Sequence, residues 1–322
     1  MSSEKLSETE LIKRLFLPLA RNYKGALNLG DDAALIPDHP GLDTVITTDC
    51  LVEGVHFLST DPPAAVAARA LRSNLSDLAA MGACPHVYTM AISIPGHIDI
   101  RWLEAFAAQL DTDQRAYNIH LAGGDTVATP GPLNISITAM GHVPTGSATA
   151  RSGASPGDGI YVTGTIGDAA LGLKLLTGQL SLSDDVARDF LIDRFHFPTA
   201  RIETGITLRE QATACADISD GLLRDLGNIC TVSGCHAVID WELVPLSPAT
   251  KAVYENDNAY MELILSGGDD YELVLTGPED LHGPFTRIGT MNSTENAKSP
   301  TTVRKNGEVL AYMKSSGYEH GW

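Results

Sequence analysis

The chain has 322 residues, more than a single compact core usually organises, so two domains are expected. Hydrophobic residues make up 43% and charged residues 19% of the sequence, which is typical of a globular protein and argues against intrinsic disorder. Lys and Arg total 22 against 40 Asp and Glu, and the formal net charge of −18 argues against nucleic-acid binding through a basic patch.

The first ten residues are polar and acidic, whereas a secretory signal needs a cationic segment followed by an apolar one. No uninterrupted apolar run approaches the ~18 residues that span a bilayer. The five cysteines have no C-x-x-C spacing, so they predict neither a disulfide framework nor a zinc site. We therefore expect a cytoplasmic protein with free thiols and no membrane partner.

Strands and helices alternate along the first half of the chain. Ser7 followed by Glu10 is a capping-box pattern that begins a helix. After it, strands are predicted at residues 43–49, 86–94, 119–122 and 133–143. An Ala-rich helix is predicted at residues 61–82 and a second helix at residues 99–117. Residues 144–158 are rich in Gly, Ser, Thr, Ala and Pro, which predicts a domain boundary in this segment.

The second half of the chain alternates in the same way. The predicted strands lie at residues 160–163, 214–217 and 271–276. The predicted helices lie at residues 167–176, 184–195 and 199–213, and a further helix begins at about residue 220. Asn306-Gly307 is a hairpin-turn signal. The alternation predicts an α/β protein of the α+β type with two domains, residues 1–147 and residues 148–322.

One pattern recurs along the sequence: an apolar stretch ends in aspartate beside Gly, Ser or Thr. A further aspartate, Asp77, lies among small and apolar residues of the predicted Ala-rich helix. Each aspartate by itself could cap a helix or close a turn. The pattern occurs at Leu29 to Asp32, Ile46 to Asp49, Leu121 to Asp125, Ala216 to Gly221 and Leu265 to Asp270.

Few basic residues lie near these segments, so bound cations are the natural partners of the carboxylates. Oxygen ligands without a nearby cluster of His or Cys favour Mg²⁺ over Zn²⁺. The neighbouring glycines let a phosphate approach backbone N–H groups, and Arg151 is a cationic candidate from the boundary segment. Because the chain contains neither a G-x-x-x-x-G-K-[ST] nor a G-x-G-x-x-G motif, nucleotide binding would depend largely on metal.

Eight motifs together resemble those of the thiamine-monophosphate kinase family, in the family's order from about residue 7 to the C-terminus. They are GDDAA at 30–34, TTD at 47–49, EGVHF at 53–57, NLSDLAAMG at 74–82, GGDT at 123–126, TARSGA at 149–154, SDGL at 219–222 and GGDDYEL at 267–273. The wider superfamily consists of ATP-using enzymes. The resemblance implies an N-terminal domain that binds metal and ATP, and whose sheet forms a barrel with a second subunit. It also implies a C-terminal α/β domain that completes the site for ATP and substrate.

By matched position, the resemblance implies three sets of site residues. The Mg²⁺ ligands would be Asp32, Thr47, Thr48, Asp49, Asp77, Asp125, Asp217 and Asp220. The contacts to ATP would be Gly124, Asp125, Arg151 and Ser219. The contacts to thiamine phosphate would be His56, Asp269 and Trp322.

Three positions depart from the family pattern. Asp269 stands where the family usually has Glu, so a shorter carboxylate must reach the substrate. Cys50 stands where Thr is commoner. The family tends to have an aromatic residue directly after the C-terminal histidine, whereas Trp322 comes one position later, so Trp322 or Tyr318 is the candidate to stack on the thiamine ring. An aromatic wall with Asp269 and Asp270 would suit the positive thiazolium.

The expected reaction is ATP-dependent phosphorylation of thiamine monophosphate to thiamine diphosphate, by direct in-line transfer with several Mg²⁺ ions. The accepting phosphate is already ionised at neutral pH, so neither a covalent nucleophile nor a general base is expected among the side chains. A homodimer is implied by the resemblance alone.

Two alternatives remain open. One is another ATP-using enzyme of the superfamily, such as selenophosphate synthetase, although residues 1–31 contain none of the cysteines that its reactive loop would need. The other is a non-catalytic acidic protein that binds metal or nucleotide.

Overall fold

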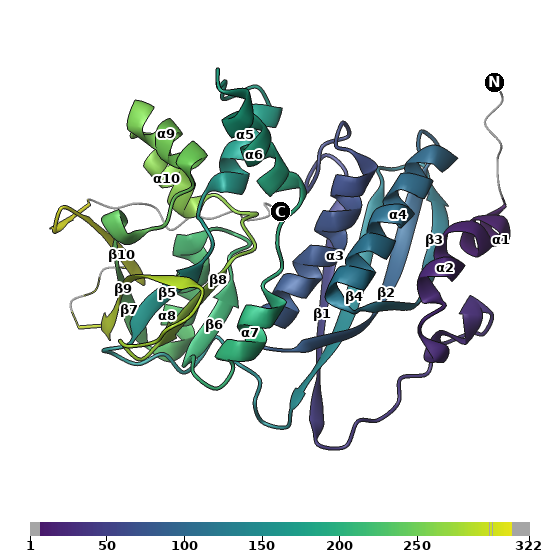
Figure 1. The fold of residues 1–322 in the computed structure, drawn as a ribbon, viewed down its shortest axis with the longest axis horizontal. Coiled ribbons are helices and arrows are strands. Elements are labelled where there is room, and N and C mark those ends of the chain that lie inside the picture. The colour runs from purple at the N-terminus through teal and green to yellow at the C-terminus, as the bar shows by residue number, and fades with distance from the viewer. Residues whose placement is uncertain (1–6, 296, 298, 311–322) are drawn as a thin grey trace. The chain divides into compact units, whose positions relative to one another are not determined.

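The computed structural model describes residues 7–295, 297 and 299–310 (Figure 1). The chain divides into two compact units. Unit 1 contains the residues up to 78 together with 83–146, and unit 2 contains 79–82 together with the residues from 147 onward. Both units combine a sheet with helices, so the fold is a two-domain α+β fold.

Unit 1 is built on a four-stranded mixed sheet with the order β1-β4-β2-β3. β4 pairs antiparallel with both β1 and β2, whereas β2 and β3 run parallel. Parallel strands need a long crossover, and α4 supplies it between β2 and β3. The strands are β1 (Leu42–Val52), β2 (Cys84–Pro95), β3 (His120–Thr129) and β4 (Asn134–Pro144).

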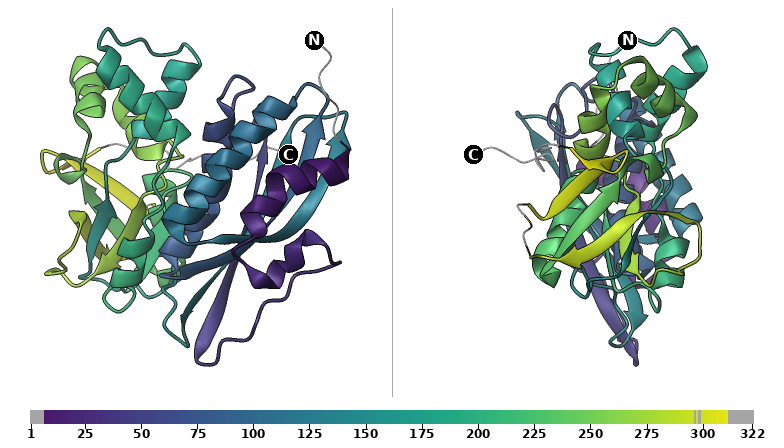
Figure 2. Two further views of the ribbon diagram at one scale, coloured as in Figure 1. Left: turned by 45° about the vertical axis from the view of Figure 1, so that its right-hand side comes forward. Right: turned by 90° about the vertical axis from the view of Figure 1, so that its left-hand side faces the viewer.

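Two long helices, α3 (Pro63–Ala80) and α4 (Ile100–Tyr117), lie over the same face of this sheet (Figures 1 and 2). The Asp99 side chain caps α4 by accepting a hydrogen bond from Trp102 N at 2.9 Å, and Asn118 ends the helix with a left-handed φ of 51°. The N-terminal segments pack beside α4 and β3. They are α1 (Glu8–Leu11), the π-helical η1 (Ile12–Phe16), α2 (Leu17–Ala20) and the 3₁₀ segment η2 (Lys24–Leu29).

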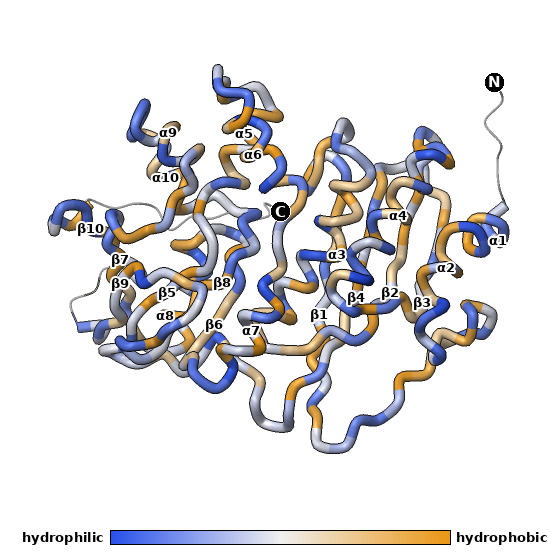
Figure 3. The backbone as a smooth tube through the Cα atoms, viewed as in Figure 1, coloured by the Kyte–Doolittle hydropathy of each residue, from blue (hydrophilic) through white to orange (hydrophobic). Residues whose placement is uncertain are grey.

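The two faces of this sheet differ in what covers them. Side chains that face the helices are buried, among them Tyr88, Ile92 and Ile137. Because side chains alternate along a strand, the other face of β1 carries exposed residues, and Ile46 is 61% exposed. Hydrophobic and hydrophilic segments likewise interleave along α3 and α4 in Figure 3, as expected of helices that bury one side.

Unit 2 is built on a seven-stranded sheet with the order β11-β10-β7-β9-β5-β8-β6. Every pair in it is antiparallel except β10 with β7. The strands are β5 (Gly159–Thr163), β6 (Ala214–Asp217), β7 (Cys235–Asp240), β8 (Leu273–Gly277), β9 (Phe285–Ser293), β10 (Thr301–Lys305) and β11 (Glu308–Val309).

The helices of unit 2 enclose an aliphatic core against this sheet. Helix α8 contacts the strands through fully buried side chains such as Leu222, Leu226 and Ile229, whereas α5, α6, α9 and α10 contact one another. The helices are α5 (Asp168–Leu176), α6 (Asp185–His196), α7 (Ile202–Leu208), α8 (Leu222–Ser233), α9 (Pro248–Asn256) and α10 (Tyr260–Ser266), with the 3₁₀ turn η3 (Trp241–Leu243). Among the described residues, no helix has the length and apolar character needed to cross a bilayer.

Most of the predicted elements are confirmed. The capping box is present, because Ser7 Oγ accepts from Glu10 N and Glu10 Oε2 accepts from Ser7 N. Asn306 and Gly307 both have positive φ and form the turn between β10 and β11, as the hairpin signal predicts. Strands β7 and β9 and helices α9 and α10 were not predicted, and α7 ends at residue 208 rather than 213.

Two strands run beyond their predicted ends, which were Asp49 for β1 and residue 122 for β3. β1 continues past Asp49 to Val52, and β3 continues past Asp125 to Thr129. The ladder of β1 with β4 is unbroken from Leu42 to Val52, and β3 pairs with β2 as far as Thr129. Backbone pairing therefore overrides the weak strand propensity of Asp, which is tolerated where a strand is only partly covered.

Candidate functional site

Asp49, Thr47 and Asp77 form one group in unit 1, at the contact of β1 with α3. Thr47 and Asp49 are two residues apart on β1 and share the face that α3 covers. The Thr47 hydroxyl donates to Asp77 Oδ2 at 2.5 Å, and Asp49 accepts a hydrogen bond from the side chain of Ser73, one helical turn before Asp77. Strand and helix periodicity together therefore place two carboxyl groups and a hydroxyl on one surface.

The surroundings of Asp49 favour a positive neighbour. Burial raises the pKa of its carboxyl, while the Ser73 hydrogen bond and the nearby His56 partly lower it again. His56 is held by its own loop, because its Nδ1 accepts from Val52 N at 3.0 Å and its carbonyl accepts from Arg69 at 3.0 Å. The structure thus brings His56, predicted to contact substrate, close to a predicted metal ligand.

Thr48 lies on the opposite face of β1 from this group. Its hydroxyl donates to the Ile137 carbonyl at 3.1 Å and accepts from the Thr138 hydroxyl at 3.0 Å. Neighbouring residues of a strand point to opposite faces, so the side chain of Thr48 does not join those of Thr47 and Asp49.

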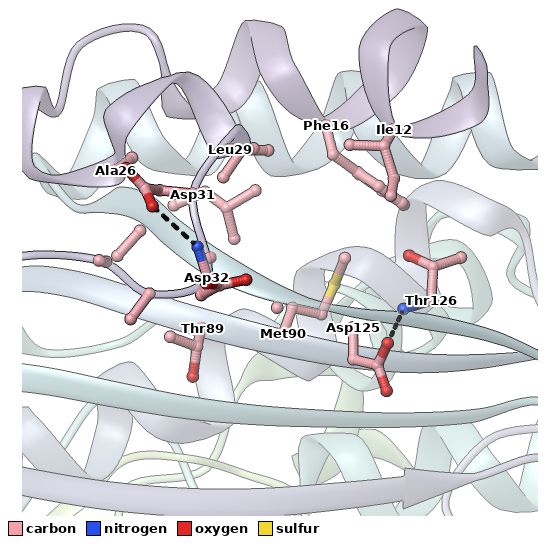
Figure 4. A pocket seen from close by; sticks show the side chains of 16 residues that line it. Ile12, Phe16, Ala26, Leu29, Asp31, Asp32, Thr89, Met90, Asp125 and Thr126 are labelled. Atoms are coloured by element: carbon pink, nitrogen blue, oxygen red, sulfur yellow. Dashed lines mark hydrogen bonds between the residues drawn. The ribbon is translucent and has the colours of Figure 1, made fainter. Parts of the chain in front are cut away.

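A second group lines a cavity of about 330 Å³ beside β3 (Figure 4). Asp31 and Asp32, from the segment after η2, and Asp125 supply its carboxyl groups. Figure 4 shows Asp32 and Asp125 on either side of Met90, with Ile12 and Phe16 of the N-terminal helical segment above them. Asp31 was not among the predicted ligands, although it stands beside Asp32 in the same motif.

Gly124 brings the backbone of β3 into this cavity. A β-carbon at this position would lie 1.9 Å from the Met90 carbonyl oxygen, so any other residue would force the two strands apart. The Asp125 carboxylate next to it accepts from Thr126 N at 2.9 Å. The cavity therefore offers open backbone and carboxylates together, which is the environment that a metal-bound phosphate requires.

The two groups of unit 1 lie at opposite edges of the sheet. β1 and β3 are the edge strands, with β4 and β2 between them. Three strand spacings amount to about 14 Å. Within unit 1, Asp32 and Asp125 are therefore brought together with each other, and Asp49 with Asp77, but the two pairs are not joined.

In unit 2 two loops lie side by side and carry the remaining predicted aspartates. Asp217 ends β6 and is 2% exposed, and the loop after it leads into α8. Asp269 N donates to the Ser219 carbonyl at 2.9 Å, and Tyr271 N donates to the Ile218 carbonyl at 2.9 Å. The motifs at 217–221 and 267–271 are therefore neighbours, as the prediction of a shared site requires.

Asp225 organises the first of these loops, and it was missed by the sequence analysis. Its Oδ2 accepts from Ser219 N at 3.1 Å and from Asp220 N at 3.0 Å. Burial raises its pKa to about 7, while Arg151 lowers it, so Arg151 acts on the same loop. The sequence did contain a signal for this role, because Asp225 lies in the first turn of a predicted helix that follows a glycine. From this position a carboxylate can accept hydrogen bonds from backbone N–H groups.

Asp270 was expected to help form the substrate pocket, but its carboxyl group has a different role in the structure. Its carboxyl group is fully buried and accepts from Gly167 N at 2.7 Å and Ala169 N at 3.2 Å at the start of α5. Burial raises its pKa well above the ordinary value. Asp270 is a structural cap because its oxygens are used by backbone, whereas Trp322 and Tyr318 lie outside the described residues.

The side chains of all three groups fit Mg²⁺ in their chemistry. They supply carboxylate and hydroxyl oxygens, which are the ligands that this cation prefers. A cation beside Asp49 would also restore the ionised form that burial disfavours. The residues with this character are Asp31, Asp32, Thr47, Asp49, Asp77, Asp125, Asp217 and Asp220.

Comparisons with known proteins agree over nearly the whole chain. The family models of AIR synthase related protein match it, the N-terminal domain over residues 30–143 and the C-terminal domain over residues 155–299. The thiamine-monophosphate kinase of Salmonella typhimurium is 45% identical over 303 residues, which is 91% of this chain and 91% of that protein.

Solved structures show the same likeness. The thiamine-monophosphate kinase of Stenotrophomonas maltophilia K279a matches with a TM-score of 0.78 and 38% identity, over 88% of this chain and 91% of that one. The structure of AaThiL complexed with AMPPCP and TMP matches with a TM-score of 0.78 and 29% identity, over 100% of both chains.

Proposed function

The chain belongs to the thiamine-monophosphate kinase family, and from this premise we propose that it transfers the γ-phosphoryl group of ATP to thiamine monophosphate, which yields thiamine diphosphate and ADP. The observation that carries the proposal is the similarity to kinases of this name along almost the full length of both chains. A relative that binds AMPPCP and TMP together supports a nucleotide and a thiamine phosphate as the two substrates.

The chemistry requires little of the protein's own side chains. A phosphate oxygen of thiamine monophosphate attacks the γ-phosphorus of ATP, a new P–O bond forms, and the bond to the bridging oxygen breaks as ADP leaves. The attacking oxygen carries no proton at neutral pH. No covalent intermediate on the protein and no general base are therefore needed.

The main barrier is repulsion between the two phosphate groups. One pair of unit charges at 4 Å costs about 4 kcal/mol at an effective dielectric constant of 20, and several such pairs meet in this reaction. Arg151, which lies close enough to lower the pKa of Asp225, offers one positive charge to the nucleotide. One arginine offsets only part of this repulsion.

We propose that Mg²⁺ ions supply the remaining positive charge and orient the phosphate oxygens. Asp32 and Asp125 would hold metal at the cavity beside β3, and Asp49 and Asp77 at β1. The carboxylates at the end of β6 would do so in unit 2. Ser219, Gly124 and Arg151 are proposed for ATP, and His56 and Asp269 for thiamine phosphate. Thr47 and Thr48 remain further candidates for metal.

The proposal also covers the cellular location and the oligomeric state of the protein. ATP as co-substrate and the five free thiols fit the cytoplasm. We also propose a homodimer formed through the exposed face of the unit 1 sheet, where Ile46 is 61% and Val127 is 46% exposed. Both side chains lie on strands at the edges of that sheet.

An acceptor comparison tests the proposed reaction. The purified chain is incubated with ATP, Mg²⁺ and either thiamine monophosphate or thiamine, and ADP and thiamine diphosphate are measured by chromatography. We expect equal amounts of ADP and thiamine diphosphate with the monophosphate, and turnover of thiamine at least about 100-fold lower, because thiamine lacks the ionised nucleophile. Equal turnover of thiamine, or ADP release without thiamine diphosphate, would contradict the proposal.

A further inference from the structure

Three histidines from separate segments of unit 1 face one another, and none of them is among the residues that line the cavity beside β3. His39 lies in the segment before β1, His86 on β2 and His142 on β4. One nitrogen from each ring can be chosen so that all lie within 4.8 Å of one another. The ring centroids of His39 and His142 are 4.5 Å apart, and those of His86 and His142 are 4.8 Å apart.

Four of the six ring nitrogens of this cluster are buried and have no hydrogen-bond partner among the described residues. His39 Nε2, His86 Nε2 and both nitrogens of His142 are buried and unpaired in the part of the chain that the structure describes. A buried polar atom without a partner is costly, and such atoms are rare in folded proteins. Unpaired nitrogens on all three rings of one cluster indicate a ligand that accepts nitrogen lone pairs.

The fold positions these rings locally. The pairing of β2 with β4 shifts register between Pro85 and Val87, so His86 is the extra residue of a β-bulge, a feature that redirects a side chain. His142 pairs with Cys84 in the same ladder, close to the bulge. The turn at His39 is fixed by its carbonyl, which accepts from Leu42 N at 3.0 Å.

The charge state of the cluster also suits a metal. Burial, followed by the neighbouring histidines, lowers the pKa of His86, and the same two causes lower the pKa of His142. Neutral imidazole is the form that ligates metal ions. Repulsion between protonated rings would oppose this packing, so the observed approach of the three rings fits the neutral form.

We propose that His39, His86 and His142 bind one divalent transition-metal ion, with Zn²⁺ as the occupant. Imidazole is a preferred ligand of Zn²⁺ and is a poor ligand for Mg²⁺, so this site is chemically distinct from the carboxylate groups. Zinc takes nitrogen ligands at about 2.0–2.1 Å, so the three rings would draw closer together around the ion, and water would complete the coordination.

The consequence of such a site is structural. His39 belongs to the segment that leads from Asp31 and Asp32 to β1, whereas His86 and His142 belong to the sheet. A shared ion would fix that segment to the sheet and thereby restrain one wall of the cavity beside β3. This inference does not depend on the proposed kinase reaction.

Metal binding can be measured on the full chain without an activity assay. The protein is stripped with a chelator and kept in excess Mg²⁺ so that carboxylate sites are occupied, and Zn²⁺ is titrated against a chromophoric competitor. Single variants His39→Gln, His86→Gln and His142→Gln are compared with His282→Gln, a change at an exposed histidine of unit 2. We expect one tight equivalent in the wild type and in the control, and at least about 100-fold weaker binding in each cluster variant.

Thermal unfolding and spectroscopy provide independent readouts. Zn²⁺ at about 100 times its dissociation constant should raise the melting temperature by about 5 °C in the wild type and the control, but not in the cluster variants. If a variant does not fold, X-ray absorption of the zinc-loaded wild type decides the question. Three imidazole ligands around the zinc would support the site. Ligation by oxygen alone, the absence of a tightly bound Zn²⁺ in excess Mg²⁺, or unchanged Zn²⁺ binding in the variants would overturn it.

Discussion

The carboxyl groups of this protein differ in whether other protein groups donate hydrogen bonds to their oxygens. Asp168 accepts from the hydroxyls of Ser247 and Thr250 at 2.6 Å each, and Asp270 caps α5 through two backbone N–H groups. These groups are satisfied inside the fold. Asp32 and Asp125 instead line a cavity, and burial of Asp49 disfavours its charge. Only the second kind gains from a bound cation.

The first prediction concerns these metal candidates. Asp49→Asn and Asp217→Asn should each reduce kcat at saturating substrates by at least about 100-fold, because a neutral amide removes charge stabilisation in the transition state. Turnover is measured for each variant, and far-UV circular dichroism verifies that the variant is folded. Asp193→Asn, at an exposed position of α6, serves as the control and should retain wild-type turnover. Near-normal rates in both site variants would refute the metal assignment.

Glu272 supports the second prediction, which concerns stability. Its carboxylate is fully buried and accepts from Arg201 through two nitrogens at 2.6 Å, from Arg194 at 2.8 Å and from the Thr163 hydroxyl at 2.6 Å. Glu272→Gln would leave two guanidinium groups without their buried anion. We expect a loss of about 3–5 kcal/mol in the free energy of unfolding, measured by urea denaturation.

An exposed pair provides the matched control for Glu272. Glu279 contacts Arg287 at 2.7 Å on the surface of unit 2. Glu279→Gln should change the free energy of unfolding by less than about 0.5 kcal/mol, because water replaces the lost contact. A similar small effect at Glu272 would show that the buried network contributes little.

At the scale of elements, the loop between β6 and α8 is held at three points. Asp225 accepts from two of its backbone N–H groups, Asp269 and Tyr271 donate backbone hydrogen bonds to it, and Gly221 allows its sharp turn. Gly221 has φ 112° and ψ 146°, a conformation essentially restricted to glycine. A β-carbon there would lie 2.4 Å from the Ser266 carbonyl oxygen.

The third prediction follows from this loop. Gly221→Ala should destabilise the protein by about 1–3 kcal/mol and lower kcat/KM for ATP, because the turn that positions Ser219 and Asp220 must shift. Gly234→Ala, at the C-terminal end of α8, is the comparison, since it also has positive φ (67°) but meets no atom within 4 Å. It should cost about 1 kcal/mol and leave kcat/KM unchanged. Equal kinetic effects in both variants would argue against a role of this turn in the site.

At the scale of the whole molecule, the uncovered sheet face of unit 1 bears on assembly. Leu42, Ile46 and Val127 are 41%, 61% and 46% exposed on strands whose other face is covered by helices. Apolar residues gathered on one sheet face favour contact with another protein surface. A second copy of the chain is the proposed partner.

The fourth prediction tests that assembly. Light scattering during size exclusion should give twice the chain mass of 34.2 kDa, and Ile46→Glu should shift the protein toward the monomer, because a charge would be buried in the contact. Val186→Glu, at a residue 80% exposed on α6, is the control and should leave the mass unchanged. A monomeric wild type would remove the homodimer from the proposal.

Local sequence signals predicted most elements of this fold correctly. The capping box at Ser7, the α4 boundaries near Asp99 and the hairpin at Asn306 depend on residues within a few positions of one another. β7 and β9 were missed because their strand character comes from pairing with each other in the interior of the seven-stranded sheet, which no local pattern reveals.

The sequence by itself determined the alternation of strands and helices and the motifs that place the chain in its family, because both are local properties of the chain. Only the tertiary structure decided which polar side chains meet. It joined the loops of Asp217 and Asp269, used Asp270 as a cap, revealed Asp225, and gathered three histidines. The physical reason is that long-range strand register and packing set these distances, and spacing along the chain does not contain them.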